Sequence, residues 1–373
     1  MRNPFNYLQF AKGDQFFDRL KILSDLKSRF MSGQTNVVIY GPRRYGKSSL
    51  VARLAEQLEK EGFICISFDM MKMATVNLFA EAYATKTYRR LAPVRAGVRQ
   101  VADFFKSLRP KLTIGNDGEA SFSFDSSASE MGPEELSEVL DLPQRLSDGR
   151  RVLIALDEFQ EVEGILPNCE FERVMRSVIQ NHRNVSYIFL GSRHHLLRRM
   201  FTDHGRPFYK SALTMLLDKP PIDESVAFVE SRFQSAGIAI SQEVARRLVD
   251  RIANIPYYIQ QLGFETFRVA DEAGHRQATD DDLNSAYAGL SGFNRDQYEQ
   301  AMLTFSTAQK KLLIALARET TEEFDAKYRN RHGLGAPSTV NSAKKKLIED
   351  GHIEQLGKCC QISDPFFAEY LRN

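Results

Sequence analysis

Short apolar runs alternate with amphipathic helical patterns along the first 220 residues of the chain. The runs are rich in β-branched residues and are bounded by polar or turn residues, which is typical of buried strands in a parallel sheet. Between the runs, apolar residues recur every three or four positions and predict helices, as at Leu50, Leu54 and Leu58. The predicted core strands are 36–40, 63–69, 151–158, 185–192 and 213–217. The pattern therefore predicts an α/β fold with a parallel sheet.

A long segment, 70–150, separates two of these core strands. Its apolar spacing predicts helices at 76–91, 98–108 and 134–148. Between the last two, alternating residues on either side of a glycine turn at 115–118 predict a hairpin. We expect this segment to be an insertion into the core, and the sequence assigns it no role.

Beyond residue 218 the strand pattern gives way to helices. Lys219-Pro220-Pro221 breaks the chain and marks a domain boundary. Four helices are then predicted at 227–237, 241–253, 257–274 and 280–288, with Ser241 and Thr279 as N-caps. Since a helical bundle after such a core commonly covers a ligand, we expect a lid.

The last part of the chain, 293–373, has a different order of elements. Helices are predicted at 309–318, 322–331 and 337–350, followed by a two-stranded wing within 352–362. Helix, helix, turn, helix and hairpin make a winged helix. We therefore expect three domains: an α/β core at 1–218 that contains the insertion 70–150, a helical lid at 219–292 and a winged-helix domain at 293–373.

Composition narrows the class of protein without deciding its function. A chain of 373 residues is long enough for two or three domains, and its net charge of +2 gives no global attraction to nucleic acid. The four cysteines lack a CxxC pair, so we expect neither a disulfide frame nor a zinc site. Residues 1–5 lack an apolar signal core, and no apolar run of about 18 residues occurs. These features predict a cytoplasmic protein that does not cross a membrane.

One glycine-containing segment lies between the first predicted strand and the helix that follows it. Residues 41–48 read GPRRYGKS and fit G-x-x-x-x-G-K-[ST], the phosphate-binding loop. Its glycines let the backbone approach a phosphate, and the turn directs N–H groups toward an anion at a helix N-terminus. The alternative, a chance match in a glycine turn, does not explain the flanking strand and helix. The predicted nucleotide-binding residues are Gly41, Pro42, Arg43, Arg44, Tyr45, Gly46, Lys47, Ser48 and Ser49.

Two loop residues and two acidic residues predict the chemistry of this site. Lys47 can reach the β- and γ-phosphates of ATP, and the Ser48 hydroxyl can hold Mg²⁺. Asp157 and Glu158 end an apolar strand, and the carboxyl ends of parallel strands face the ligand crevice. We expect Asp157 to hold Mg²⁺ through water. Glu158, one residue later, would orient or deprotonate the attacking water.

The strand at 185–192 adds further candidates at its carboxyl end. We expect Ser192 to lie beside the γ-phosphate as a sensor, which makes Glu158, Lys47 and Ser192 the predicted catalytic residues. Arg193 is either a charge stabiliser or an ordinary surface arginine. His194 and His195 begin a helix without other ligands nearby, so we predict no metal site there.

The third helix of the predicted winged helix suggests a macromolecular partner. Val340, Ala343, Leu347 and Ile348 are expected to face inward, while Asn341, Lys344 and Lys345 face outward. Residues 326–348 carry six Lys or Arg and no Asp or Glu, a patch that can contact DNA phosphates. The alternative is a solvated basic face on a winged helix that binds a protein.

The motifs together resemble the archaeal-type ATPase family, relatives of the AAA+ and STAND NTPases, over nearly the whole chain. The resemblance implies a five-stranded parallel core of the additional-strand type, a helical lid and a C-terminal winged helix. It also implies Lys47 and Ser48 on phosphate and Mg²⁺, Asp157 on Mg²⁺ and Glu158 as base. The matching segments are 3–5, 41–50, 156–160, 191–192, 207–209, 254–257 and 364–367.

Two positions depart from the family pattern. Asn254 stands where related STAND proteins usually have glycine, and Lys210 stands where many relatives have glycine. The helix predicted at 14–30 resembles a lead-in helix that lies near adenine in related proteins. Phe5, Phe17 and Arg19 therefore either border the base or simply pack the helix on the sheet edge.

The resulting hypothesis is an ATP-binding protein that hydrolyses ATP slowly and couples nucleotide state to the winged helix. The rival hypothesis is a regulator or scaffold in which ATP fixes a conformation and hydrolysis is incidental. A small-molecule kinase is disfavoured because the sequence suggests no acceptor pocket. The sequence leaves open whether the chain forms a homo-oligomer.

Overall fold

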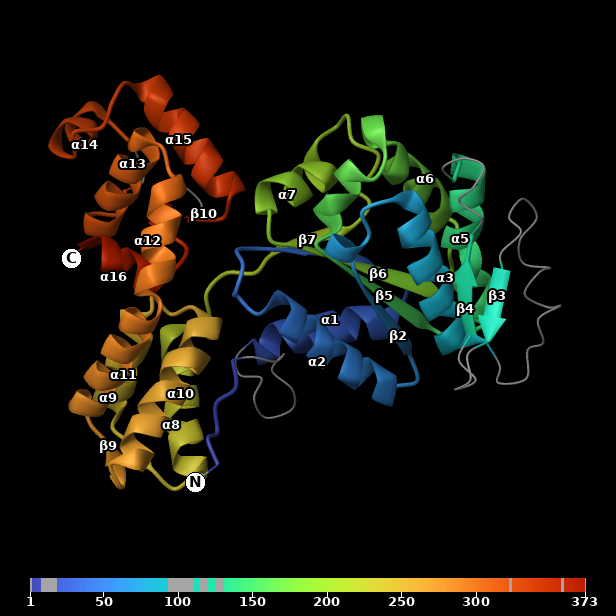
Figure 1. Cartoon of the computed structure of the whole chain (residues 1–373). Coiled ribbons are helices and arrows are strands. Elements are labelled where there is room, and N and C mark those ends of the chain that lie inside the picture. The colour runs from blue at the N-terminus through green and yellow to red at the C-terminus, as the bar shows by residue number, and fades with distance from the viewer. Residues whose placement is uncertain are drawn as a thin grey trace. The chain divides into compact units, whose positions relative to one another are not determined.

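A computed structural model describes residues 2–7, 19–92, 111–114, 120–124, 131–321, 324–356 and 359–372 (Figure 1). The predicted helix at 98–108 and residues 14–18 of the lead-in helix lie outside this part. The chain forms two compact units. The lid–wing unit combines Met1–Arg19, Pro42–Gly46 and Asp218–Asn373, and the sheet unit combines Leu20–Gly41 and Lys47–Leu217. The three domain limits expected from the sequence stay a prediction.

The sheet unit is built on five parallel strands. Their order is β2-β5-β6-β1-β7, and each pair of neighbours runs parallel. β6 lies between β1, which leads into the glycine loop, and β5, which ends in Asp157; this is the additional-strand arrangement expected from the resemblance. The strands are β1 (Asn36–Tyr40), β2 (Ile64–Asp69), β5 (Val152–Asp157), β6 (Val185–Gly191) and β7 (Leu213–Leu216).

Helices cover both faces of this sheet. Figure 1 shows α1 and α2 together on one face, and α3, α5 and α6 on the other. The predicted insertion contributes α3, α5 and the antiparallel pair β3 (Lys111–Ile114) and β4 (Ala120–Ser123), which confirms the hairpin. The helices are α1 (Leu20–Ser32), α2 (Lys47–Lys60), α3 (Val76–Leu91), α5 (Pro133–Leu146), α6 (Glu170–Ile179) and α7 (His194–Thr202).

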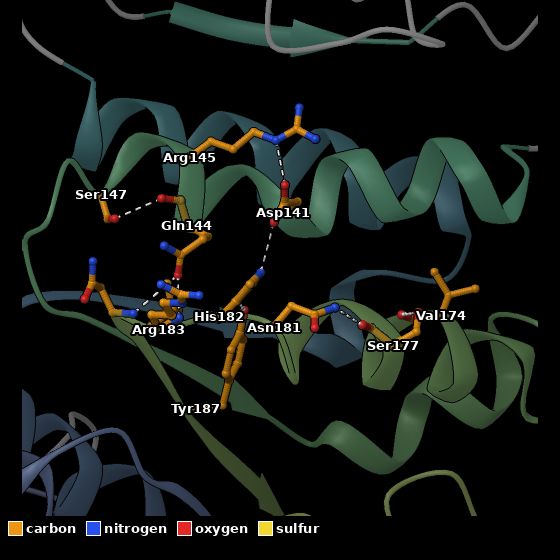
Figure 2. Close-up of polar contacts among 12 residues, drawn as sticks. Asp141, Gln144, Arg145, Ser147, Val174, Ser177, Asn181, His182, Arg183 and Tyr187 are labelled. Atoms are coloured by element: carbon orange, nitrogen blue, oxygen red, sulfur yellow. Dashed lines mark hydrogen bonds and ion pairs between the residues drawn. The ribbon is translucent and has the colours of Figure 1, made fainter.

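Polar contacts fasten α5 to the turn between α6 and β6 (Figure 2). The buried His182 ring lies 3.0 Å from the Tyr187 hydroxyl through Nδ1, and its Nε2 lies 3.3 Å from Asp141 Oδ1. Asp141 also accepts from Arg145 at 2.6 Å. Gln144 Oε1 accepts from the backbone N–H of Arg183 at 2.7 Å. The contacts from His182 and Arg145 outweigh burial and lower the pKa of the Asp141 carboxyl, so they favour its charged form.

Four helices of the lid–wing unit form the predicted bundle: α8 (Ile222–Ser235), α9 (Gln242–Arg251), α10 (Pro256–Glu272) and α11 (Asp280–Phe293). The predicted N-caps are confirmed, since Ser241 Oγ and Thr279 Oγ1 each accept from a backbone N–H at 3.3 Å. A short parallel pair, β8 (Ala239–Ile240) with β9 (Gln277–Ala278), was not expected. In the described part of the chain, no helix combines the length and apolar character that a membrane span requires.

The remaining helices and the wing confirm the winged helix in outline. It consists of α12 (Arg295–Thr304), α13 (Thr307–Arg318), α14 (Ala326–Arg331), α15 (Pro337–Glu349), β10 (Ile353–Leu356), β11 (Cys359–Ile362) and α16 (Pro365–Arg372). The helix expected from residue 322 begins only at Ala326, because the Asp325 side chain caps it by accepting from the Tyr328 N–H at 2.7 Å. The apolar pattern did not predict α12 or α16.

The faces of α15 agree with the prediction except at one lysine, with Ile348 partly buried against the core. Val340, Ala343 and Leu347 are buried, and Asn341 and Lys345 are exposed. Lys344 was expected to face outward but is partly buried, with its ammonium 5.4 Å from the centre of the Phe324 ring. A cation over an aromatic face gains electrostatic attraction, and this draws the lysine stem toward the domain.

The two departures from the family pattern have a common backbone cause. Asn254 and Lys210 both lie in the left-handed region, with φ of 55° and 54°. Glycine adopts this region without strain, whereas other residues pay a steric cost. Asn254 offsets part of that cost, since its Nδ2 donates to the Pro220 carbonyl at 2.7 Å.

Candidate nucleotide-binding site

The glycine loop joins β1 to α2, and its conformation explains both glycines. A Cβ added at Gly41 would lie 2.4 Å from the Leu217 carbonyl oxygen. Gly46 has a φ of 83°, and Arg44 shares the left-handed region with a φ of 69°. Left-handed residues alternating with ordinary ones turn successive N–H groups to one side, which forms a concavity for anions. The helix N-terminus at Lys47 adds its positive dipole end.

The first two residues of α2 point their polar groups at fixed partners. Lys47 is buried, and its Nζ donates to the Gly41 carbonyl at 2.8 Å. Ser48 Oγ donates to Asp157 Oδ2 at 2.6 Å. The structure thus brings a hydroxyl of the loop and a carboxylate from the end of β5 together, as the two motifs required.

Glu158 follows β5 in a left-handed conformation, with φ of 52° and ψ of 44°. Its Oε2 accepts from Ser192 N at 3.0 Å, Ser192 Oγ at 2.8 Å and Gln160 Nε2 at 2.6 Å. Burial raises the pKa of the Glu158 carboxyl, but these hydrogen bonds and the charge of Lys47 oppose it and leave the pKa lowered. The carboxylate is therefore held in one orientation in its charged form.

Asp157 has the opposite electrostatic balance. Burial raises its pKa above the ordinary value, and the neighbouring charge of Glu158 adds to the rise, against the hydrogen bond from Ser48. A cation at this place would relieve both effects. The donors are a hydroxyl and a carboxylate, the oxygen ligands that Mg²⁺ takes, usually with waters and substrate phosphates. Ser48 and Asp157 therefore fit Mg²⁺. In the part of the chain that the structure describes, no cluster of three or more His, Cys, Asp or Glu could hold a metal without other ligands.

Sequence reasoning missed Gln160, which orients Glu158. Its signal was its place two residues after the acidic pair, on the 3₁₀ turn Phe159–Gly164. Ser192 touches Glu158, which gives it a positioning contact besides the predicted sensor role. Arg193 is half-exposed, and its guanidinium lies 3.8 Å from the Glu161 carboxylate.

The three N-terminal residues considered as neighbours of the adenine base have different surroundings. Phe5 is buried in the lid–wing unit, edge-on to Phe228 and Phe233 with ring centres 6.1 and 5.4 Å away, so it packs the bundle. Arg19 is buried and donates to the backbone carbonyls of Tyr45 at 2.6 Å and Asp218 at 2.5 Å. Arg19 thus contacts the glycine loop itself. Phe17 lies outside the described residues.

Comparisons with known proteins agree with this architecture. Residues 16–262 match a family described as an ATPase domain predominantly from Archaea, and residues 296–373 match a probable winged helix domain. No curated protein sequence matches the chain.

Solved structures share the fold at low sequence identity. A Walker-type ATPase of Pyrococcus abyssi has a TM-score of 0.65 at 18% identity, covering 99% of this chain and 100% of that one. The Aeropyrum pernix ORC2 protein, in ADPNP and ADP complexes, has a TM-score of 0.60 at 13% identity, covering 99% and 95%. The Aeropyrum pernix ORC1 protein, in complex with DNA, has a TM-score of 0.54 at 14% identity, covering 98% and 94%.

Proposed function

Because the chain belongs to the family of ATPase domains found predominantly in Archaea, we propose that it binds ATP with Mg²⁺ and hydrolyses it slowly. The observation that carries this proposal is the 2.6 Å contact between the Ser48 hydroxyl and the Asp157 carboxylate, with Glu158 one residue further on. The nucleotide would be held by residues 41–49, with Lys47 on its β- and γ-phosphates and the amides of the loop around them.

Hydrolysis by these residues would be mainly positioning and charge stabilisation. Glu158, ionised and fixed by Ser192 and Gln160, would accept a proton from the attacking water or hold that water in line. Lys47 would neutralise charge on the transferred phosphoryl group. Ser48 and Asp157 would hold Mg²⁺, which neutralises phosphate charge when bound.

Glu158→Gln tests the assignment of the base. The amide keeps the size of the side chain but cannot take a proton, so ATP turnover should be lost while Mg-ATP still binds. Glu170→Gln, on the next helix, is the matched control and should hydrolyse ATP like the wild type. Persistent turnover in Glu158→Gln would remove Glu158 from the role of base.

For the winged helix, the proposed partner is DNA. The exposed Asn341 and Lys345 support it, since they stand on the helix that enters the major groove in other winged and helix-turn-helix proteins. Neighbouring carboxylates neutralise part of the positive charge of this face. Lys346 pairs with Asp350 at 3.0 Å, and Arg331 pairs with Glu319 at 2.7 Å. A salt-independent interaction would favour a protein partner instead.

A second candidate function, a nucleotide-dependent regulator, is favoured by one observation. The Tyr45 side chain of the glycine loop is hydrogen-bonded to Glu354 of the winged helix, so the two parts are connected without any hydrolysis. If Glu158→Gln, loaded with ATP, binds the winged-helix partner as the wild type does, hydrolysis is incidental and the regulator is the better description.

A further inference from the structure

The two central side chains of the glycine loop are held by residues from the far end of the sequence. Tyr45 is fully buried, and its hydroxyl donates to Glu354 Oε1 at 2.6 Å. Glu354 lies on β10 opposite Gln361 of β11. Gln361 Nε2 donates to the same Glu354 oxygen and lies 3.3 Å from the Tyr45 hydroxyl. Tyr45 therefore closes a three-membered polar cluster with both strands of the wing.

Arg44, next to it in the loop, contacts three residues: Tyr257, Tyr258 and Asp364. Its guanidinium lies over the rings of Tyr257 and Tyr258, 5.1 and 4.9 Å from their centres. Its Nη1 lies 3.4 Å from Asp364 Oδ2, just before α16. The Arg44 carbonyl accepts from the Tyr257 N–H at 3.3 Å. The Arg44–Asp364 pair is partly exposed, so it contributes less than the buried Tyr45–Glu354 bond.

Phosphate binding by the loop does not require the contacts that Arg44 and Tyr45 make with the winged helix. The loop holds an anion with its amides and Lys47, and the motif leaves positions 44 and 45 unspecified. Glu354 is only 5% exposed, and a buried carboxylate is costly unless it is hydrogen-bonded. Burial accordingly raises the pKa of Glu354, against the hydrogen bonds from Tyr45 and Gln361. The buried acid of the wing thus receives one of its two hydrogen bonds from the loop and the other from Gln361 of the wing itself.

The loop depends on the wing in return. Arg44 is a non-glycine residue in the left-handed region, a conformation that persists only where the surroundings enforce it. That conformation, with Gly46, shapes the anion-binding concavity of the loop. Of the contacts to Arg44, those from Tyr257 and Tyr258 come from α10, and the Asp364 pair comes from the winged helix. The winged helix also holds the adjacent Tyr45 through Glu354.

We propose that Glu354, with Gln361 and Asp364, is a positioning residue that holds the loop in its anion-binding shape, so that a docked wing is a condition for tight ATP binding. These residues and their loop partners Arg44 and Tyr45 form the clasp. A partner that draws the winged helix away from the loop weakens ATP binding, and by reciprocity ATP strengthens the clasp. The inference rests on the proposed function, since it assumes that the loop binds ATP.

The test compares Mg-ATP affinity, by titration calorimetry on the full chain, between the wild type and variants of the clasp. Glu354→Leu removes the acceptor, and its dissociation constant should rise about tenfold, the effect of one lost hydrogen bond to a charged group. Glu354→Gln should recover most of this affinity, because its amide oxygen still accepts from Tyr45. Glu299→Leu, an exposed acid of α12, is the matched control and should bind like the wild type.

A double-mutant cycle separates the clasp from a general loss of structure. Tyr45→Phe should weaken binding in the wild type but add little in Glu354→Leu, since the bond that it removes is already gone. Full additivity would overturn the proposal. Circular dichroism checks the fold of each variant. If Glu354→Leu does not fold, the single variants Tyr45→Phe and Glu354→Gln replace the cycle: Tyr45→Phe should bind Mg-ATP more weakly than Glu354→Gln, and equal, wild-type affinity in both would overturn the proposal.

Amide hydrogen exchange gives the reciprocal measurement. Mg-ATP should slow exchange in β10 and β11 of the wild type and have little effect on them in Glu354→Leu. Failure of the wild type to bind Mg-ATP would overturn the proposed function itself. A wild type that binds, with clasp variants of equal affinity and wing exchange that ignores ATP, would overturn the clasp alone.

Discussion

Ser48 Oγ and Asp157 Oδ2 lie 2.6 Å apart, although 109 positions separate the two residues in the chain. Ser48 is fixed by the turn from β1 into α2, and Asp157 by the end of β5, so the contact depends on the arrangement of the parallel sheet. β6, inserted between β1 and β5, contributes Ser192 to the same edge. A hydroxyl, two carboxylates and a lysine therefore converge because strand ends converge.

Ser192→Ala should lower kcat for ATP about tenfold, part of the 10²- to 10⁴-fold that a general base typically contributes. The substitution removes the 2.8 Å hydroxyl bond to Glu158 but keeps the backbone bond at 3.0 Å, so orientation is weakened rather than lost. The KM for ATP should change little. Steady-state phosphate release measures both constants, with Ser177→Ala on α6 as control. An unchanged kcat would show that Ser192 does not position Glu158.

Lys345→Ala should weaken DNA binding and reduce the slope of log K against log salt by about 1, as expected for one lost phosphate contact. Lys345 is an exposed lysine of α15, 4.0 Å from Glu349. Fluorescence anisotropy with a labelled duplex at several salt concentrations measures the slope. Lys21→Ala, an exposed lysine of α1, should leave it unchanged. A wild-type slope of zero would contradict the DNA proposal.

Lys210→Gly should raise the free energy of unfolding by about 0.5–1 kcal/mol, because relief of the left-handed backbone exceeds the entropy that glycine adds to the unfolded chain. Lys210 is exposed with a φ of 54°, so little packing is lost. The chain has no tryptophan, so urea unfolding is followed by circular dichroism. Lys311→Gly, at an exposed position inside α13, should destabilise instead. Destabilisation by Lys210→Gly would show that its side chain contributes more than the strain costs.

Asp141→Asn should lower the free energy of unfolding by about 1.5–3 kcal/mol at pH 7, the usual contribution of a hydrogen bond to a charged group. The folded pKa of Asp141 is lowered, chiefly by His182, so its stabilisation is present above the unfolded pKa and disappears as pH falls through the folded one. The difference from the wild type should therefore shrink at pH 3. Asp25→Asn, an exposed acid paired with Arg29, should cost little at either pH. A pH-independent difference would contradict the electrostatic explanation.

The elements that carry the site were predictable because each has a local signal. The glycine loop, the strand before it and the Asp157–Glu158 strand end are each contiguous in sequence, and parallel-sheet geometry brings strand ends together. The N-caps at Ser241 and Thr279 were predictable for the same reason, since a cap bonds within three residues.

What the sequence did not reveal depends on distant segments. Nothing near Tyr45 indicates that its hydroxyl meets Glu354, 309 positions away. The partial burial of Lys344 depends on Phe324, and helical spacing alone places that lysine outside. Leu20 continues the apolar spacing of Leu23 and Leu26 in α1 but is 71% exposed. Periodicity predicts a face, whereas tertiary packing decides which positions at its margin are covered.

Titration calorimetry of the folded wild type with Mg-ATP, beside Lys47→Ala, tests the central claim most directly. We predict saturable binding at one site, and a dissociation constant at least about tenfold higher in Lys47→Ala, equivalent to about 1.4 kcal/mol. Lys60→Ala, further along α2, should bind like the wild type. No uptake of Mg-ATP by the wild type, or equal affinity in Lys47→Ala, would contradict the account.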